Sequence, residues 1–295
     1  MKMRTFLILS LAAVGLLAGC SQAPNDDSSL SVSGVSDDAA SAGEPIAREL
    51  IDEGRVSAIS RLLDQGADID APNDQGATPL MVAIAMRKPQ VVDLLLERGA
   101  DVNRASKGGE TPLVSAVITN QVELGQRLVA HGADLSPQSL TGALALGTAA
   151  HLGHEHWVRF LVENGLSPNA TDQRGIMALQ RAAARPSPAM VALLLDLGAE
   201  PDRPNAQNRA PLIDAAGAGC LDCVRALLAA GADIDRQTTV YRHTPLLEAT
   251  VKRRPEVVAH LIEQGADRTL TDDEGLTALD HARRMNADVL VGLLE

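Results

Sequence analysis

The sequence predicts an all-α solenoid built from helix-turn-helix units that are joined by hairpin-like loops. A Gly-Ala-Asp signal and its variants return every 33 or 34 residues along most of the chain. Aromatic residues make up only 1% of the 295 residues, although hydrophobic residues make up 45%. Large β-sandwiches and barrels depend on aromatic and β-branched side chains. Because small and aliphatic residues supply the apolar surface instead, closely packed helices are favoured.

The charge of the chain argues against one broad class of partner. The sequence holds 26 Lys and Arg against 38 Asp and Glu, which gives a net charge of −12 at pH 7. Non-specific binding to nucleic acid depends on the neutralisation of phosphates by basic residues. We therefore expect no nucleic-acid partner. Three cysteines are also too few for a disulfide-based scaffold.

The N-terminal residues have the features of a secretory signal. Lys2 and Arg4 form a short basic region, and residues 6–17 form an apolar run that ends in small residues. This run is too short to cross a bilayer as a helix, whereas its length and its small-residue end are typical of a signal peptide. We expect export from the cytoplasm.

The end of this signal, Leu17-Ala18-Gly19-Cys20, resembles the lipobox of bacterial lipoproteins. The resemblance implies a signal peptide over residues 1–19, cleavage before Cys20 and acylation of that cysteine. Several acyl chains on one residue would anchor a protein stably, so we expect membrane contact through the lipid anchor only. In this family Ser21 after the cysteine favours the outer membrane and a periplasm-facing position. The alternative is an ordinary signal peptide that happens to contain a cysteine.

Residues 20–44 are rich in Ser, Asp, Ala and Gly and hold few large aliphatic residues. Such a segment cannot bury enough apolar surface to fold, so we predict a disordered tether. The repeat domain is predicted to follow over residues 45–295.

Three markers stay in one register through this repeat domain. The first is a glycine near the end of each unit, at Gly66, Gly99, Gly132, Gly165, Gly198, Gly231 and Gly265. The second is Thr-Pro-Leu, which begins at Thr78, Thr111 and Thr244 and has degenerate forms that begin at Leu144, Met177, Ala210 and Thr277. The third is an alanine five residues beyond each of these starts, at Ala83, Ala116, Ala149, Ala182, Ala215, Ala249 and Ala282.

These markers predict the structure of one unit. The Thr hydroxyl can cap a first helix, and Pro is tolerated in the first helical turn. The alanine allows that helix to approach its neighbours closely. A Leu-Leu-like pair such as Leu95-Leu96 belongs to a second helix, which ends at the glycine. A single unit cannot bury its own apolar face, so stability must come from stacking.

The combined markers resemble the ankyrin repeat family over residues 45–295, with about eight repeats of which the first and last are caps. The resemblance implies a non-enzymatic module that binds proteins on its concave face, without a cofactor, metal or small-molecule substrate. One departure concerns the family's Thr-Pro-Leu-His, because His is replaced at its position by Met81, Val114, Gly147, Gln180, Ile213, Leu247 and Asp280. The hydrogen bonds of that histidine must be absent or replaced.

Two short clusters could carry chemistry. His151, His154 and His156 lie within six residues, but the repeat register favours a turn between them over a metal site. Cys220 and Cys223 form a C-x-x-C, which could be a structural pair of small residues, a disulfide or a redox pair. The repeat register places Cys223 at a buried position of a second helix.

The resemblance carries the variable positions of the family onto candidate partner-binding residues. These are Gln75, Met86, Lys107, Ile118, His151, Arg174, Ile176, Arg185, Arg209, Tyr241, His243 and Lys252. The basic members of the set have no acidic residue among the variable positions around them. We therefore expect the partner to dock across units five to seven and to present an acidic or mixed surface, with these residues outside the stacking core. Tyr241 lies where one hairpin has a single extra residue, and an exposed Tyr beside Arg is typical of an interface hot spot.

Within this reading, an inhibitor or immunity protein and a helper of a periplasmic enzyme are both compatible with the sequence. The alternative function is a periplasmic redox or metal-handling protein that uses Cys220 and Cys223 or the cluster His151–His156.

Overall fold

The computed structural model describes residues 46–136 and 139–295. The predicted signal peptide (1–19) and tether (20–44), with the predicted lipidation site Cys20, lie outside the described residues. Within the described ranges the chain forms sixteen helices and one isolated β-bridge, between Thr171 and Met177. The predicted all-α solenoid is therefore confirmed.

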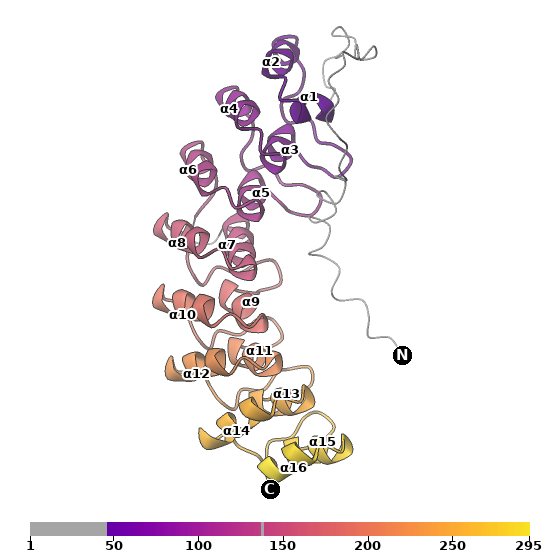
Figure 1. The fold of residues 1–295 in the computed structure, drawn as a ribbon, viewed down its shortest axis with the longest axis vertical. Helices are drawn as coiled ribbons and strands as arrows, with labels where there is room; N and C mark the ends of the chain where they lie inside the picture. Colours follow the sequence, from indigo (N-terminus) through magenta and orange to yellow (C-terminus); the bar gives the residue numbers. More distant parts are fainter. Residues whose placement is uncertain (1–45, 137–138) are drawn as a thin grey trace, which may run out of the picture. The chain divides into compact units, whose positions relative to one another are not determined.

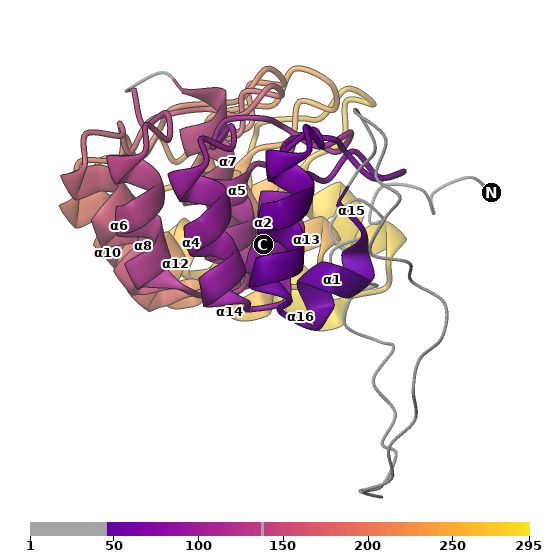
Figure 2. The ribbon, with the colours of Figure 1, turned by 90° about the horizontal axis from the view of Figure 1, so that it is seen from above.

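The helices stand in two rows, and each unit contributes one helix to each row (Figure 1). The first-helix row consists of α1 (Arg48–Asp52), α3 (Pro79–Ala85), α5 (Pro112–Ile118), α7 (Leu140–Leu152), α9 (Ala178–Ala184), α11 (Pro211–Ala218), α13 (Pro245–Val251) and α15 (Ala278–Arg284). The second-helix row consists of α2 (Val56–Asp64), α4 (Pro89–Glu97), α6 (Val122–Ala130), α8 (Glu155–Glu163), α10 (Pro188–Asp196), α12 (Leu221–Ala229), α14 (Pro255–Glu263) and α16 (Asp288–Leu294). The loops between units extend beyond the first-helix row, and seen from above they gather on one side (Figure 2).

The helix starts follow the predicted chemistry. The hydroxyls of Thr78, Thr111 and Thr244 each accept a hydrogen bond from the backbone N–H three residues later. These bonds satisfy one of the backbone donors that the first turn of a helix leaves without a partner. Pro89, Pro188 and Pro255 each begin a second helix, a position at which proline is tolerated.

The repeated alanine forms the centre of the stack. All seven of these alanines have no exposed surface, which agrees with the predicted close approach of the first helices to their neighbours. Where one unit buries a large side chain in the stack, a small residue in the neighbouring unit makes room for it. Trp157 in α8 is fully buried, and a Cβ built on Gly125 of α6 would lie 2.5 Å from its ring. The absence of a side chain at Gly125 therefore makes the room for the indole.

Consecutive units are also linked through the turns that follow the second helices. In each link a carboxylate or amide oxygen accepts the backbone N–H of a residue in the next unit. The pairs are Asp70 with Asp101, Asn103 with Asp134, Asn169 with Glu200, Asp202 with Asp233, and Asp235 with Asp267. The polar residues of the turns therefore connect the stack as well as ending each helix.

Unit four departs from the predicted helix start. The degenerate marker at Leu144 predicts a helix from that point, but α7 begins at Leu140, and Ser139 caps it by accepting a hydrogen bond from the N–H of Gly142 at 3.1 Å. No Thr-Pro pair fixes the start in this unit, so an earlier Ser provides the cap. One extra turn of helix stands where the other units have a hairpin.

The first unit presents polar residues on one side, as expected of a cap: Arg48 and Asp52 are exposed while Leu50 and Ile51 are buried. No helix in the described part of the chain is long and apolar enough to cross a membrane.

Candidate functional site

The twelve residues predicted to contact a partner lie in the hairpins, or within or directly after a first helix. The exposed members are Gln75, Lys107, Arg174, Arg185, Tyr241 and Lys252, and the half-buried members are Met86, Ile118, His151, Ile176, Arg209 and His243. We call the hairpins together with the accessible side of the first-helix row the hairpin face. The positions carried over from the resemblance therefore share one side of the repeat domain.

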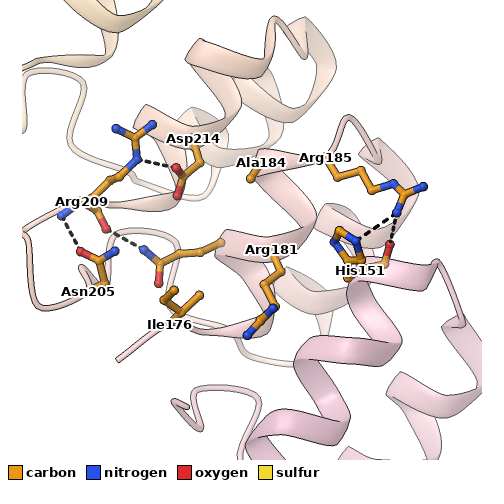
Figure 3. Close-up of a pocket in the computed structure, with 9 residues that line it drawn as sticks. His151, Ile176, Arg181, Ala184, Arg185, Asn205, Arg209 and Asp214 are labelled. Atoms are coloured by element: carbon orange, nitrogen blue, oxygen red, sulfur yellow. Dashed lines mark hydrogen bonds and ion pairs between the residues drawn. The ribbon is translucent and has the colours of Figure 1, made fainter. Parts of the chain in front are cut away.

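A pocket of about 340 Å³ opens on the hairpin face where units four, five and six meet (Figure 3). Four of the predicted residues line it, together with five that were not predicted: His151, Ile176, Gln180, Arg181, Ala184, Arg185, Asn205, Arg209 and Asp214. The other eight predicted residues lie outside its lining.

Arg185 reaches back from unit five to the end of α7 in unit four. Its Nη1 donates to the Nε2 of His151 at 3.2 Å and to the His151 carbonyl at 3.1 Å. Because a guanidinium can only donate, His151 accepts at Nε2 in this arrangement. Burial lowers the pKa of His151, and the positive charges of Arg185 and Arg181 lower it further. The neutral form of this histidine is therefore favoured.

A proline restricts the backbone at Arg185. Pro186 follows it, and a residue before proline is restricted to extended conformations; Arg185 has φ −116° and ψ 112°. In units two, three and seven the corresponding residue ends its helix in a helical conformation, and the next residue takes a positive φ. Proline cannot take a positive φ, so unit five turns differently.

Arg181, which the sequence analysis did not select, lies between Arg185 and the hairpin of unit five. Its Nη2 is 2.8 Å from the Oδ2 of Asp172. A Cβ built on Gly147 of α7 would lie 2.8 Å from the Nε of Arg181, so the glycine leaves space for this side chain. We call His151, Arg181 and Arg185 the cationic end of the pocket.

The opposite end of the pocket belongs to a second polar group that continues into unit seven. Arg209 is 2.5 Å from Asp214 and 3.1 Å from Glu248, and Glu248 is 2.8 Å from the Nδ1 of His243. Burial raises the pKa of Asp214, although Arg209 opposes this shift. Burial would also raise the pKa of Glu248, but its hydrogen bond from His243 and its pairing with Arg209 lower that pKa to about 2. We call these four residues the ion-pair network.

This network corrects the expectation for Arg209. The sequence analysis placed this residue outside the stacking core and counted it as an available cation. The Arg209 side chain is only 27% exposed. Its positive charge is neutralised by the carboxylates of Asp214 in the same unit and Glu248 in the next unit. The variable positions contain no acidic residue nearby, but Asp214 and Glu248 lie in the adjoining first helices and supply the negative charge. Arg209 is therefore part of the structure between units six and seven.

The lengthened hairpin is confirmed by its hydrogen bonds. In unit seven the N–H of Thr238 donates to the carbonyl of His243, five residues on, whereas the other hairpins close over four residues, as from Asn73 to Ala77. The extra residue leaves Tyr241 at the tip with 61% of its surface exposed. Its ring centroid lies 5.9 Å from that of His243, so Tyr241 stands beside the ion-pair network.

The C-x-x-C of unit six is a disulfide in the structure. Cys220 caps α12, and its sulfur accepts a hydrogen bond from the backbone N–H of Cys223. Cys220 is 6% exposed and Cys223 has no exposed surface. Thiol exchange requires access to the attacked sulfur, so this burial favours a structural disulfide over a redox centre.

The three clustered histidines point to separate surroundings. His151 lies in the last turn of α7 and accepts from Arg185, while His154 directly precedes α8 and His156 is exposed within it. Burial lowers the pKa of His154. The described residues hold no group of three or more His, Cys, Asp or Glu that could bind a metal ion.

Gln180, Arg181 and Asp214 were not predicted from the sequence; Gln180 is buried, and Arg181 and Asp214 are half-buried in their first helices. One signal was present, because Gln180 occupies the position of the family's histidine. Its side-chain amide donates to the Arg209 carbonyl in the next hairpin at 2.7 Å and its oxygen accepts from the N–H of Met177. Gln180 therefore replaces hydrogen bonds that the absence of histidine had left open.

The comparison with protein families gives one result that agrees with this geometry. Three overlapping segments of the chain, residues 38–106, 103–172 and 146–238, match the model described as ankyrin repeats (3 copies). No curated protein shows significant similarity to the chain. The matched segments cover more than half of the sequence, and among the described residues they run from α1 through α12. The chain belongs to the ankyrin repeat family, whose repeats indicate a module for protein–protein interaction.

Proposed function

We propose that this chain is a lipid-anchored protein-binding module of the bacterial cell envelope, which faces the periplasm and binds its partner on the hairpin face. The anchor would be Cys20, the tether residues 20–44 and the binding domain residues 45–295. Ser21 after the anchor favours the outer membrane. The proposal gives the chain a binding role and no catalytic one.

The observation that carries the binding role is the concentration of accessible, chemically varied side chains on the hairpin face. The face combines a polar pocket between units four and six with the exposed ring of Tyr241 in unit seven. Such a combination suits an interface, where an aromatic anchor and a charged site fix one orientation of a partner. The stacked helices behind it hold these groups in fixed positions.

The cysteines support an oxidising compartment. Cys220 and Cys223 are joined to each other, and the third cysteine of the sequence is Cys20. Disulfides persist in the periplasm and are rare in the cytosol. An acylated Cys20 would leave the mature protein with no free thiol.

Substitution of Cys20 tests the anchor. In cells grown with radiolabelled palmitate, we expect the wild type and Ser21→Ala to carry label and to sediment with membranes. Cys20→Ala should lose the label and should either become soluble in the periplasm or remain unprocessed. Unchanged labelling and sedimentation of Cys20→Ala would contradict the lipoprotein assignment.

Capture of the partner tests the binding face. The full chain would be cross-linked in intact cells, and the proteins retained from envelope extracts would be identified. We expect Tyr241→Ala to weaken capture of a specific protein, whereas Arg159→Ala on the exposed side of α8 should not. If substitutions in the second-helix row abolish capture while those of the hairpin face do not, the proposed face is wrong.

The identity and activity of the captured protein distinguish an inhibitor or immunity protein from a helper of a periplasmic enzyme. If the partner is an enzyme, an inhibitor or immunity protein should abolish its activity at stoichiometric ratios. A helper should leave that activity intact or raise it, and should stabilise the partner against heat.

A further inference from the structure

We propose that the cationic end of the pocket, formed by His151, Arg181 and Arg185, is a subsite for one carboxylate of the protein partner, either an Asp or Glu side chain or the end of its chain. This inference rests on the proposed function, since it assigns one chemical group of the partner to one place on the hairpin face.

The first argument is the incomplete pairing of Arg185. Its guanidinium offers five N–H donors in a planar fork, and its hydrogen bonds go from Nη1 to two acceptors of His151. Neither acceptor carries a charge when the histidine is neutral. No carboxylate forms an ion pair with Arg185 in the described ranges, so Arg185 lines the pocket with a positive charge that no carboxylate neutralises.

The second argument is the contrast with the opposite end. Arg209 lies between two carboxylates, which leaves it little attraction for another anion. Arg181 shares the single carboxylate of Asp172, and that carboxylate also accepts the backbone N–H groups of Arg174 and Ile176. An incoming anion is therefore attracted to the cationic end.

The third argument is that the cations are held in place before any ligand arrives. Pro186 restricts the backbone of Arg185, and its side chain is held against the end of α7. Arg181 lies in the space that Gly147 leaves. Pre-organisation of this kind reduces the entropic cost of binding. An incoming carboxylate can accept charge-assisted hydrogen bonds from such donors.

The size of the pocket is compatible with such a ligand. A volume of about 340 Å³ is sufficient for a side chain or a short chain end. The lining also includes the apolar side chains of Ile176 and Ala184, which can contact the methylene groups of a Glu side chain. A peptide carboxylate therefore fits better than a fully hydrated inorganic ion.

Nuclear magnetic resonance of histidine-labelled full chain gives a direct test. The probes are N-acetyl-triglutamate amide, N-acetyl-triglutamine amide and inorganic phosphate, each added at constant ionic strength and at pH 7. The ring signals of His151 are assigned with His151→Gln. We expect saturable shifts of the His151 signals with the triglutamate peptide and none with its neutral counterpart.

Two variants and a control locate the effect. Arg185→Gln should weaken peptide binding by about tenfold or more, as loss of a charge-assisted contact does. Gly147→Ala should also weaken it by displacing Arg181, and alanine favours the helix, so this variant should keep its fold. Arg159→Gln removes the same charge from the second-helix row and should bind like the wild type. Equal weakening by all three variants would overturn the proposal, because it would indicate a general charge effect.

The remaining outcomes separate the subsite from the proposed function. If phosphate shifts His151 at concentrations at least tenfold lower than the peptide does, the pocket is a small-anion site and the proposal is wrong. If the wild type captures its partner from envelope extracts and Arg185→Gln captures it equally well, the subsite is wrong although the proposed function stands. If the wild type captures no protein while the peptide still shifts His151, the subsite stands and the proposed function fails.

Discussion

The two ends of the pocket place arginines of two consecutive units in contrasting surroundings. Arg185 at the cationic end meets a histidine and a backbone carbonyl, while Arg209 in the ion-pair network meets two carboxylates. Both residues occupy variable positions, and from the sequence alone they look equivalent. The difference shows that the net charge at the surface of a repeat depends on the carboxylates in the adjoining first helices.

The largest expected effect separates the two arginines by stability. Arg209→Gln leaves Asp214 without its cation and leaves Glu248 only its contact with His243, and loss of one partner of a buried ion pair costs about 3–5 kcal/mol. Arg185→Gln removes no carboxylate partner and should change the free energy of unfolding by less than about 0.5 kcal/mol. Urea unfolding followed by circular dichroism measures both. Similar values for the two variants would mean that the ends do not differ in this way.

The acid stability of the ion-pair network provides the next test. Glu248 has a pKa of about 2 in the folded chain against an ordinary 4.5, so its contribution to stability is present above pH 4.5 and lost as the pH falls towards 2. Between pH 7 and pH 3 the loss from this group is roughly 2 kcal/mol. Asp214, whose pKa is raised, acts in the opposite direction. Comparison with Glu248→Gln isolates the first contribution, because that variant should lose correspondingly less stability over the same range.

Core packing should not distinguish the two ends. Ala182 in α9 and Ala215 in α11 both have no exposed surface. Replacement of either by Leu should destabilise the stack by roughly 1–3 kcal/mol through overpacking. Thermal melts of the two variants test this equivalence. If neither variant lowers the melting temperature, the helix register is wrong, and if only one does, the ends differ in packing as well as in charge.

The smallest effect on folding is expected at the tip of the lengthened hairpin. Tyr241→Ala should leave the melting temperature within error because the ring is exposed. Once the partner is known, the same change should raise the dissociation rate and cost about 1–3 kcal/mol of binding if the ring becomes buried in the complex. Val240→Ala is the matched control, since Val240 is also exposed and lies in the same hairpin. Equal effects of both substitutions in surface plasmon resonance would remove Tyr241 as an anchor.

Most of the fold was predictable because each unit contains residues that mark where its helices begin and end. Thr78 and its equivalents cap a helix through a local hydrogen bond, and the buried alanine is a fixed distance away in sequence. The start of α7 was not predictable from the same marker, because Ser139 caps it outside the repeat register. The prediction of this helix start failed because Ser139, and not a residue of the Thr-Pro-Leu register, caps the helix.

The candidate site was less predictable because its contacts cross repeats. The sequence indicated His151, Ile176, Arg185 and Arg209 as accessible, and these four do line one pocket. It did not indicate that Glu248 would neutralise Arg209, since the two residues are 39 positions apart. The position of the Arg181 side chain depends on the space left by Gly147, which has no side chain. A pattern of residue types along the sequence does not reveal such a space.

The links between successive turns have a consequence for how the chain reaches its native state. Each link joins residues 31 or 32 positions apart, and in the described ranges no side-chain hydrogen bond between the units extends beyond 39 positions. A chain with contacts of such short range closes only small loops while it folds. Each unit therefore needs only its predecessor as a template. Folding can advance along the chain one unit at a time.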